Sequence, residues 1–350
     1  MVVIHNKMHN IFFKSLDILG FFICGWIIKT VFCVIIVIER NLGDIVILLN
    51  NQKLKEVDFV NEKELQTYFE NNLDSILGLK FIETEFPVGS FRIDTLAFDE
   101  ETKSFKIIEY KNVKNHSLVD QGYTYLKLML ERKADFVLKY NLKTNSNISV
   151  NDIDWSQSRI IFVSPIFTPY QMNATDFKNI PVDLYKVTRY ENGIVDIDPI
   201  QKTSNVKIEE VQIEAKGNTV NDVSKEIKVY TEEDHFAKGT DTLKLVYETF
   251  KEKVLQLDDI DIDVKKVYIA FKGSKNIVDV EFFRNFIQIT LNMKYGTLND
   301  PNKIMSSYVL DDGKVIGHHG NGDYYISIKH VDEVDQLIPF IKQSIQVNKK

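Results

Sequence analysis

A pair of acidic residues and a lysine interrupt two stretches that otherwise have the character of buried β-strands. The stretch FKIIEYKN (residues 105–112) places Glu109 and Lys111 after two isoleucines, and the preceding stretch FRIDTLAFD contains Asp94. A polar loop, DEETKS, joins the two stretches, which predicts a β-hairpin. Carboxylates bind hard divalent cations, and a nearby lysine can hold or polarise a water molecule. The hairpin is therefore a candidate reaction centre.

The expected register of this hairpin brings the two acids together. In an antiparallel pair, facing residues have numbers with a constant sum, and a loop centred on residues 101–102 makes that sum 203. Asp94 then faces Glu109 with Cβ atoms about 5 Å apart, and Lys111 follows on the same face. Two carboxylates at this separation repel each other unless a cation lies between them. We therefore expect Mg²⁺ or Mn²⁺ here, with waters and phosphate oxygens completing its coordination.

This arrangement resembles the PD-(D/E)XK nuclease superfamily, whose signature is an acid, a spacer, and then an acid, any residue and a lysine. Asp94, followed by Glu109 and Lys111, fits that signature. Ile93 stands where the superfamily often has a proline. The resemblance implies that Asp94 and Glu109 bind metal and that Lys111 serves the nucleophile. It also implies a Mg-dependent endo- or exodeoxyribonuclease in bacterial DNA repair or defence.

Two features outside the hairpin match the exonuclease-like branch of that superfamily. Gln121 and Tyr125 lie one turn apart on a predicted helix, as in the QxxxY element of that branch, and would orient the site or contact DNA. Glu64 on the first predicted helix fits the further acid that often completes the metal site. Glu62 and Glu70 lie on the same helix and are alternatives for that role.

The predicted elements indicate an α/β fold, a mixed sheet flanked by helices, and the resemblance implies that this fold is restriction-endonuclease-like. Hydrophobic periodicity predicts helices over residues 61–79 and 117–134. Apolar runs bounded by turn residues predict strands over 80–88, 91–99, 105–112, 135–140 and 158–165, with a terminal hairpin over 182–197. Helices and strands in this order form a mixed sheet flanked by helices.

Composition divides the chain into four parts. We expect a hydrophobic segment over residues 1–42, the nuclease-like domain over 43–200, a polar linker over 201–234 and a smaller α+β domain over 235–350. The last part resembles an uncharacterised domain that often follows PD-(D/E)XK modules in bacterial proteins. Substrate recognition or dimerisation, as a homodimer, is the role we expect of it.

Residues 18–38 form an apolar stretch with the length of a membrane-spanning helix, interrupted only by Lys29. A membrane anchor, a misassigned translation start with the true start near Leu42, and a buried core helix are the three interpretations. Both cysteines, Cys24 and Cys33, lie in this stretch, so the rest of the chain needs no oxidising compartment. We expect a cytoplasmic protein, with the membrane as a partner only if this segment is genuine.

The net charge of −7 argues against a protein that coats nucleic acid through a general excess of positive charge. A local basic groove remains compatible with the sequence, built from Lys103, Lys106, Lys114, Lys127, Arg132 and Lys133. Nucleic acid, DNA before RNA, is the expected partner. The alternative is a catalytically inactive nuclease-like protein that binds nucleic acid or acts as a scaffold. His318 and His319 are adjacent and lack ligand spacing, which disfavours a second metal site.

Overall fold

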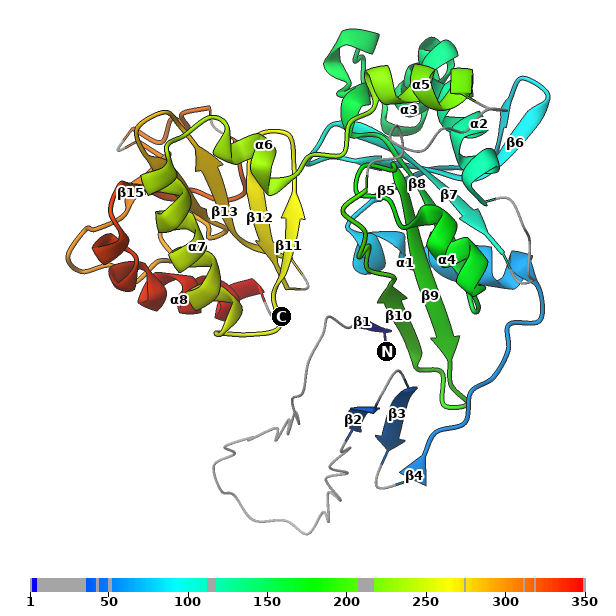
Figure 1. Ribbon diagram of the computed structural model, residues 1–350, viewed down its shortest axis with the longest axis horizontal. Coiled ribbons are helices and arrows are strands. Elements are labelled where there is room, and N and C mark those ends of the chain that lie inside the picture. The colour runs from blue at the N-terminus through cyan, green and yellow to red at the C-terminus, as the bar shows by residue number, and fades with distance from the viewer. Residues whose placement is uncertain are drawn as a thin grey trace, which may run out of the picture.

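The computed structural model describes residues 2–4, 36–41, 44–49, 52–111, 118–206, 217–273, 275–310, 312–317 and 319–348. Most of the apolar stretch 18–38 lies outside these residues, so its interpretation stays a prediction. Within the part of the chain that the structure describes, no helix is long and apolar enough to cross a membrane. Two large sheets, each flanked by helices, lie in separate halves of the molecule (Figure 1), which confirms the expected α/β class. We call the halves the first unit and the second unit.

The first unit is built on a seven-stranded mixed sheet. The strands β7, β8 and β9 run parallel to one another, whereas β5, β6 and β7 form an antiparallel meander. In spatial order the strands are β1 (Val2–Ile4), β10 (Val195–Pro199), β9 (Val182–Arg189), β8 (Arg159–Ser164), β7 (Ser104–Tyr110), β6 (Phe91–Asp99) and β5 (Lys80–Val88). β9 and β10 are the predicted terminal hairpin, which is confirmed.

Helices cover both faces of this sheet. On one face lies α1 (Glu62–Leu77), which Asn61 caps by accepting the Glu64 backbone N–H at 2.9 Å. The apolar spacing of Leu65, Phe69 and Leu73 turns one stripe of α1 into the core. On the other face lie α2 (Leu118–Glu131), α3 (Lys133–Thr144), α4 (Pro169–Thr175) and α5 (Gly217–Glu226).

Two segments differ from the sequence-based expectation. Residues 135–140 are not a strand but part of α3, because Phe136 and Tyr140 are four residues apart and pack together on one helix face. The second is the expected linker, 201–234, which contains α5. Val223 and Ile227 are buried against the first unit, so this part of the linker is packed into its core.

The second unit is a two-layer structure. Its sheet has the spatial order β11 (Asp261–Val264), β12 (Ile269–Lys272), β13 (Asn276–Phe282), β14 (Ile287–Leu291), β16 (Tyr324–Ile328) and β15 (Ser306–Ser307). Its helices are α6 (Glu232–Phe236), α7 (Asp241–Leu255) and α8 (Ile338–Asn348). Phe250 of α7 and Ile341 of α8 pack against Phe271 and Ile289 of the sheet, forming a core separate from those of the first unit. A further small sheet comprises β2 (Ile36–Asn41), β3 (Asp44–Leu49) and β4 (Gln52–Lys53).

The two units meet at the loop that joins β6 to β7. The carboxylate oxygen Oε1 of Glu101, in this loop, accepts hydrogen bonds from Asn276 Nδ2 at 2.7 Å and Asn321 Nδ2 at 2.9 Å. The hydroxyl of Tyr268 donates to the same oxygen. All three donors belong to the second unit, so a single carboxylate of the first unit connects three segments of the second.

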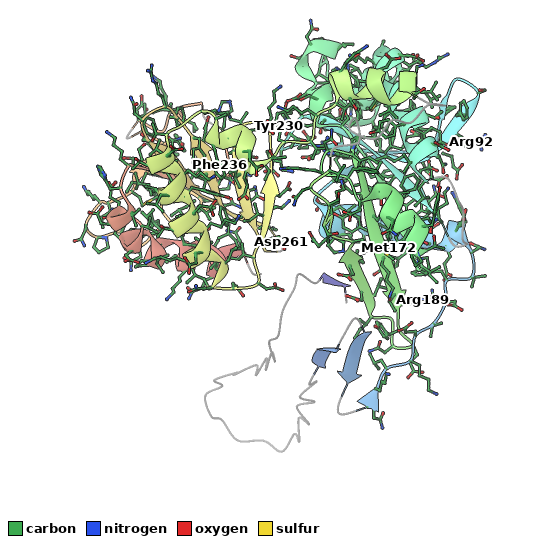
Figure 2. The ribbon with its side chains drawn as sticks, viewed as in Figure 1. Arg92, Met172, Arg189, Tyr230, Phe236 and Asp261 are labelled. Atoms are coloured by element: carbon green, nitrogen blue, oxygen red, sulfur yellow. The ribbon has the colours of Figure 1, made fainter. Side chains whose placement is uncertain are left out.

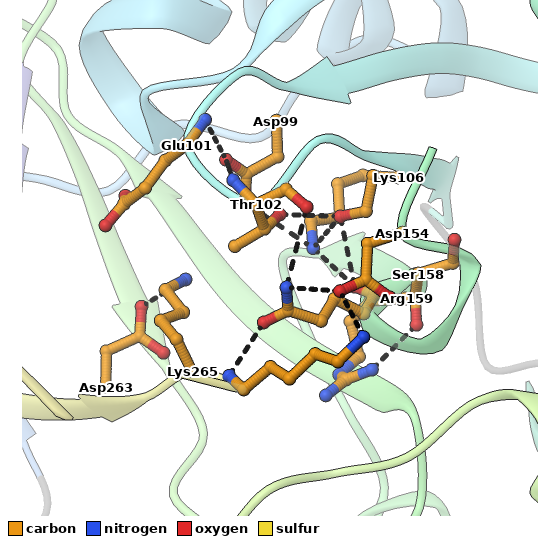
Figure 3. A network of polar contacts seen from close by, with 12 residues as sticks. Asp99, Glu101, Thr102, Lys106, Asp154, Ser158, Arg159, Asp263 and Lys265 are labelled. Carbon is orange, nitrogen blue, oxygen red and sulfur yellow. Dashed lines mark hydrogen bonds and ion pairs between the residues drawn. The ribbon is translucent and has the colours of Figure 1, made fainter. Parts of the chain in front are cut away.

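Charged residues extend this contact (Figure 3). Lys106 on β7 lies 3.5 Å from Asp99 and donates to the Gln157 carbonyl at 2.7 Å. From the second unit, Lys266 Nζ lies 3.0 Å from Asp154 of the first unit, and the Lys266 backbone N–H donates to Gln157 Oε1 at 3.0 Å. Burial lowers the pKa of Lys106 to about 8, and the charge of Asp99 acts against that shift. The contact between the units is therefore polar and partly desolvated.

Replacing Glu101 by alanine is expected to loosen the second unit from the first. The variant loses three hydrogen bonds between the units, each contributing about 1 kcal/mol. Small-angle X-ray scattering should then give a larger radius of gyration than for the wild type. Glu100→Ala is the matched control, because Glu100 bonds to Lys80 and Tyr140 inside the first unit. Identical scattering from Glu101→Ala and the wild type would refute this role of Glu101.

Candidate active site

The β6–β7 hairpin has the register that the sequence predicts. Phe98 pairs with Phe105 and Leu96 with Ile107, so the sum of facing residue numbers is 203. Regular pairing ends at Thr95 and Ile108. Asp94 and Glu109 occupy the next facing positions, where the two strands separate.

Where the regular ladder ends, the two carboxylates accept backbone N–H groups of the strands. Glu109 Oε1 accepts the backbone N–H of Asp94 at 3.1 Å, and Asp94 Oδ2 accepts the backbone N–H of Tyr110 at 3.0 Å. Each acid is thus fixed to the strand that carries the other. This crossed arrangement holds both carboxylates at the point where β6 and β7 diverge.

Helix α2 supplies the next contacts. Gln121 Nε2 donates to Glu109 Oε2 at 2.7 Å, and Lys111 Nζ lies 3.4 Å from the same oxygen. Tyr125, one turn beyond Gln121, donates its hydroxyl to the Arg92 carbonyl at 3.0 Å. The structure therefore brings together five of the six residues that the sequence singles out: Asp94, Glu109, Lys111, Gln121 and Tyr125.

The electrostatics of the pair follow from burial. The residue Glu109 is 1% exposed. Burial, and after it the negative charge of Asp94, raise the pKa of Glu109 to about 7, while Lys111 acts in the opposite direction. Burial also raises the pKa of Asp94, against the Tyr110 N–H and the charge of Lys111. Burial and mutual repulsion therefore oppose the ionisation of both carboxylates at once. A bound cation would offset that repulsion and favour the ionised forms.

Glu64 does not join Asp94 and Glu109 in a group of three acids that could hold a metal ion, so the structure does not support its assignment to the metal site. Its Oε1 accepts from Arg189 Nη1 at 2.7 Å, and its Oε2 accepts the Val60 backbone N–H at 2.6 Å. The Val60 N–H, and after it Arg189, lower the pKa of Glu64. The physical reason for the difference is the position of Glu64 in the first turn of α1, where its carboxylate stabilises the helix start and a distant strand.

Gln66 on α1 contacts the site, although the sequence pattern gives it no expected role. The Gln66 side chain is buried, and its Nε2 donates to the Asp94 carbonyl at 2.7 Å and to Glu70 Oε1 at 2.9 Å. The available signal was a polar residue between two core positions of an amphipathic helix, Leu65 and Phe69. Such a residue must find buried hydrogen-bond partners.

Glu85 on β5 is a second residue near the pair to which the sequence pattern gives no expected role. Thr84 pairs with Thr95 and Phe86 with Ile93, so Glu85 lies opposite Asp94, but its φ of 51° interrupts the ladder there. A left-handed conformation in a residue other than glycine costs about 1 kcal/mol or more. The charge of Glu85 contributes to the raised pKa of Asp94, as does that of Glu62 on α1.

The donor set fits a metal held mainly by water and substrate. Among the residues that the structure describes, no group of three or more His, Cys, Asp or Glu side chains could hold a metal ion. Mg²⁺ commonly binds through one or two carboxylates and keeps several waters or phosphate oxygens. Asp94 and Glu109 meet that requirement. In the second unit, His319 pairs with Glu281 at 3.5 Å, and His318 lies outside the described residues.

The basic residues expected to form a groove have other contacts. Lys103 pairs with Glu100, Lys127 with Glu131, Arg132 with Asp135 and Lys133 with Glu226, while Lys114 lies outside the described residues. Lys106 is buried at the contact between the two units, and therefore does not belong to a phosphate-binding surface. Each of the first four positions therefore has an acidic partner, and a groove built from the six positions stays a prediction.

Comparison with known proteins places the chain in a family. It is 44% identical over 298 residues to an uncharacterised protein of Haemophilus influenzae, covering 84% of this chain and 96% of that protein. The chain belongs to the family of that protein. Residues 232–348 match a domain of unknown function (DUF5655), in agreement with the expected uncharacterised C-terminal domain.

Two solved structures share limited similarity with the chain. A repair endonuclease from Pyrococcus abyssi is 18% identical, with a TM-score of 0.20 over 34% of this chain and 44% of that chain. The structure of an EndoMS-dsDNA2 complex is 14% identical, with a TM-score of 0.24 over 40% of this chain and 60% of that chain. These alignments cover less than two thirds of either solved chain, and TM-scores this low support no shared mechanism.

Proposed function

We propose that the protein is a metal-dependent nuclease that hydrolyses phosphodiester bonds in DNA. The observation that carries this proposal is the crossed pair of Asp94 and Glu109, fixed on adjacent strands with Lys111 beside it. The choice of DNA, and a role in bacterial repair or defence, follow from the resemblance to PD-(D/E)XK nucleases.

Asp94 and Glu109 are the residues that would hold Mg²⁺ or Mn²⁺. Such an ion, when bound, supplies neutralisation of charge on the phosphate and polarisation of its oxygens. The protein itself fixes the positions of the two carboxylates. Gln121 fixes Glu109 through its 2.7 Å hydrogen bond, and Gln66 fixes the backbone of Asp94 on the opposite side. Both carboxylates are thereby held in place before substrate binds.

Lys111 is the residue that we assign to the nucleophile. Its Nζ lies 3.4 Å from Glu109 Oε2, and its side chain is 12% exposed, so it retains access to a water molecule at the edge of the site. An ammonium group there can orient that water and stabilise negative charge that develops on the phosphate oxygens. Tyr125, whose hydroxyl is bonded to the Arg92 carbonyl, holds the start of β6 against α2.

A catalytically silent nuclease-like protein that binds nucleic acid is the second candidate. The observation that favours it is the absence, among the described residues, of a third carboxylate close enough to complete a metal cluster. Nuclease-like folds without activity fit such a reduced site.

The two candidates differ in a cleavage assay. The full chain is incubated with labelled DNA in Mg²⁺, in Mn²⁺ and in a chelator, beside Asp94→Asn. Cleavage that requires the metal and disappears in the variant supports the nuclease. DNA binding without cleavage under any of these ions supports the silent protein.

Glu64→Gln is expected to leave the cleavage rate nearly unchanged and to lower the thermal unfolding temperature. Glu64 stabilises the start of α1 and binds Arg189, away from the carboxylate pair. Glu62→Gln is the matched comparison on the same helix turn, because the charge of Glu62 raises the pKa of Asp94. If the folded Glu64→Gln protein had no cleavage activity, Glu64 would have to be assigned to the metal site after all.

A further inference from the structure

The strand that carries Asp94 begins with a half-exposed aromatic residue, Phe91. Phe91 begins β6, three residues before Asp94, and is 47% exposed. Three residues of strand span about 10 Å. A single exposed aromatic side chain is common on protein surfaces and is not by itself evidence of a binding site. Whether Phe91 has a binding role therefore depends on the residues around it.

Contacts fix Phe91 relative to the carboxylates. Its ring meets that of Tyr125 edge to face, with centroids 6.1 Å apart and planes at 86°. The Tyr125 hydroxyl lies 3.4 Å from Gln121 Nε2, which in turn binds Glu109. The same hydroxyl donates to the carbonyl of Arg92, the residue after Phe91. An aromatic ring held by this chain of contacts loses little entropy when a second ring stacks on it.

Two exposed arginines lie near Phe91 in the chain fold: Arg92 follows it in β6, and Arg132 lies against Gly89, two residues before it. The side chain of Arg92 is 67% exposed, and Figure 2 shows Arg92 at the margin of the first unit, on the side away from the second unit. Arg132, 48% exposed, lies against Gly89 in the β5–β6 turn. Their acidic partners, Glu85 at 3.7 Å and Asp135 at 3.3 Å, form exposed ion pairs. Such pairs contribute little energy, so a phosphate can replace either acid.

We propose that Phe91 stacks on an unpaired base and that Arg92 contacts the adjoining phosphate, so that the site takes single-stranded or frayed DNA in preference to an intact duplex. This inference rests on the proposed function and names its substrate class. The faces of bases are covered in a duplex and are open in a single strand, and stacking on an aromatic side chain stabilises any base. Arg92 and Arg132 supply the charge that attracts the strand.

The test measures binding without cleavage. Fluorescence anisotropy follows a labelled thymidine homopolymer, and separately a duplex, binding to the full chain in a chelator. We expect the wild type to prefer the single strand. Phe91→Ala should weaken that binding about 10-fold or more, and Phe91→Trp should restore it. Arg92→Ala should reduce the salt dependence of binding.

Tyr170→Ala is the matched control, because Tyr170 on α4 is an exposed aromatic, 67% exposed, without the contacts of Phe91. Equal losses in Phe91→Ala and Tyr170→Ala, equal affinity for duplex and single strand, or no binding by the wild type would each overturn the inference. The failures can be told apart. Binding that depends on Phe91, without cleavage in Mg²⁺, would contradict only the proposed nuclease activity. Cleavage without a preference for single strands would contradict only the proposed role of Phe91.

Discussion

Lys111→Ala is expected to cleave DNA about 100- to 1000-fold more slowly than the wild type while still binding the divalent metal. Lys111 follows the last residue of β7, and its Nζ lies 3.4 Å from Glu109 Oε2, the oxygen that does not bind the Asp94 backbone. Its removal therefore takes away a positive charge near the nucleophile and leaves both metal ligands in place. Single-turnover cleavage at saturating Mg²⁺ measures the rate, and calorimetric titration with Mn²⁺ measures metal binding.

The control for this prediction is another lysine of the same hairpin. Lys103 lies in the β6–β7 loop at the opposite end from the site, is exposed and pairs with Glu100 at 3.3 Å. Lys103→Ala should cleave at the wild-type rate. Equal rates for the two variants, or loss of Mn²⁺ binding in Lys111→Ala, would show that Lys111 does not have the assigned role.

In a chelator, the protein is expected to lose stability as the pH rises from about 5 to about 8, because Glu109 must ionise in a buried site. The folded pKa of Glu109 is raised to about 7, above its usual 4.5. The folded state therefore binds a proton more tightly than the unfolded state, and this contribution is complete below the unfolded pKa. It is lost as the pH passes through the folded pKa. The difference corresponds to about 3 kcal/mol.

Comparison with Glu109→Gln isolates this contribution from other titrating groups. The variant cannot ionise at this position, so the free energy of unfolding of the wild type relative to the variant should fall by about 3 kcal/mol between about pH 5 and about pH 8. Urea unfolding at both pH values measures it. Mg²⁺ added at the higher pH should recover stability in the wild type only. The same pH dependence in both proteins would contradict the burial of a charged Glu109.

The hairpin that carries the site could be predicted because its register depends only on residues that are close together in the sequence. The alternation of apolar and polar residues and one central loop fix which residues face each other, and Asp94 and Glu109 follow from that register. Gln121 and Tyr125 were accessible through the spacing of one helix turn. The crossed hydrogen bonds were not accessible, because they arise where the strands separate, which no local pattern records.

The errors share a different cause. An acid in the first turn of a helix can cap the helix or face a distant site, and only tertiary packing decides, as it does for Glu64 and Arg189. Residues 135–140 have a strand-like composition, yet they belong to α3, where Phe136 and Tyr140 reach the core from one helix face. α5 is similar: its few apolar residues, including Val223, gain their role only through contact with the core.

The most direct test of the central claim is the rate of Mg²⁺-dependent cleavage of labelled single- and double-stranded DNA by the full wild-type chain and by Glu109→Gln. Circular dichroism and thermal unfolding establish that both proteins are folded. We predict cleavage by the wild type that a chelator abolishes, and a rate at least about 1000-fold lower for Glu109→Gln. Comparable cleavage by both proteins, or none by the wild type with any divalent metal, would contradict the assignment of Asp94 and Glu109 to a nuclease site.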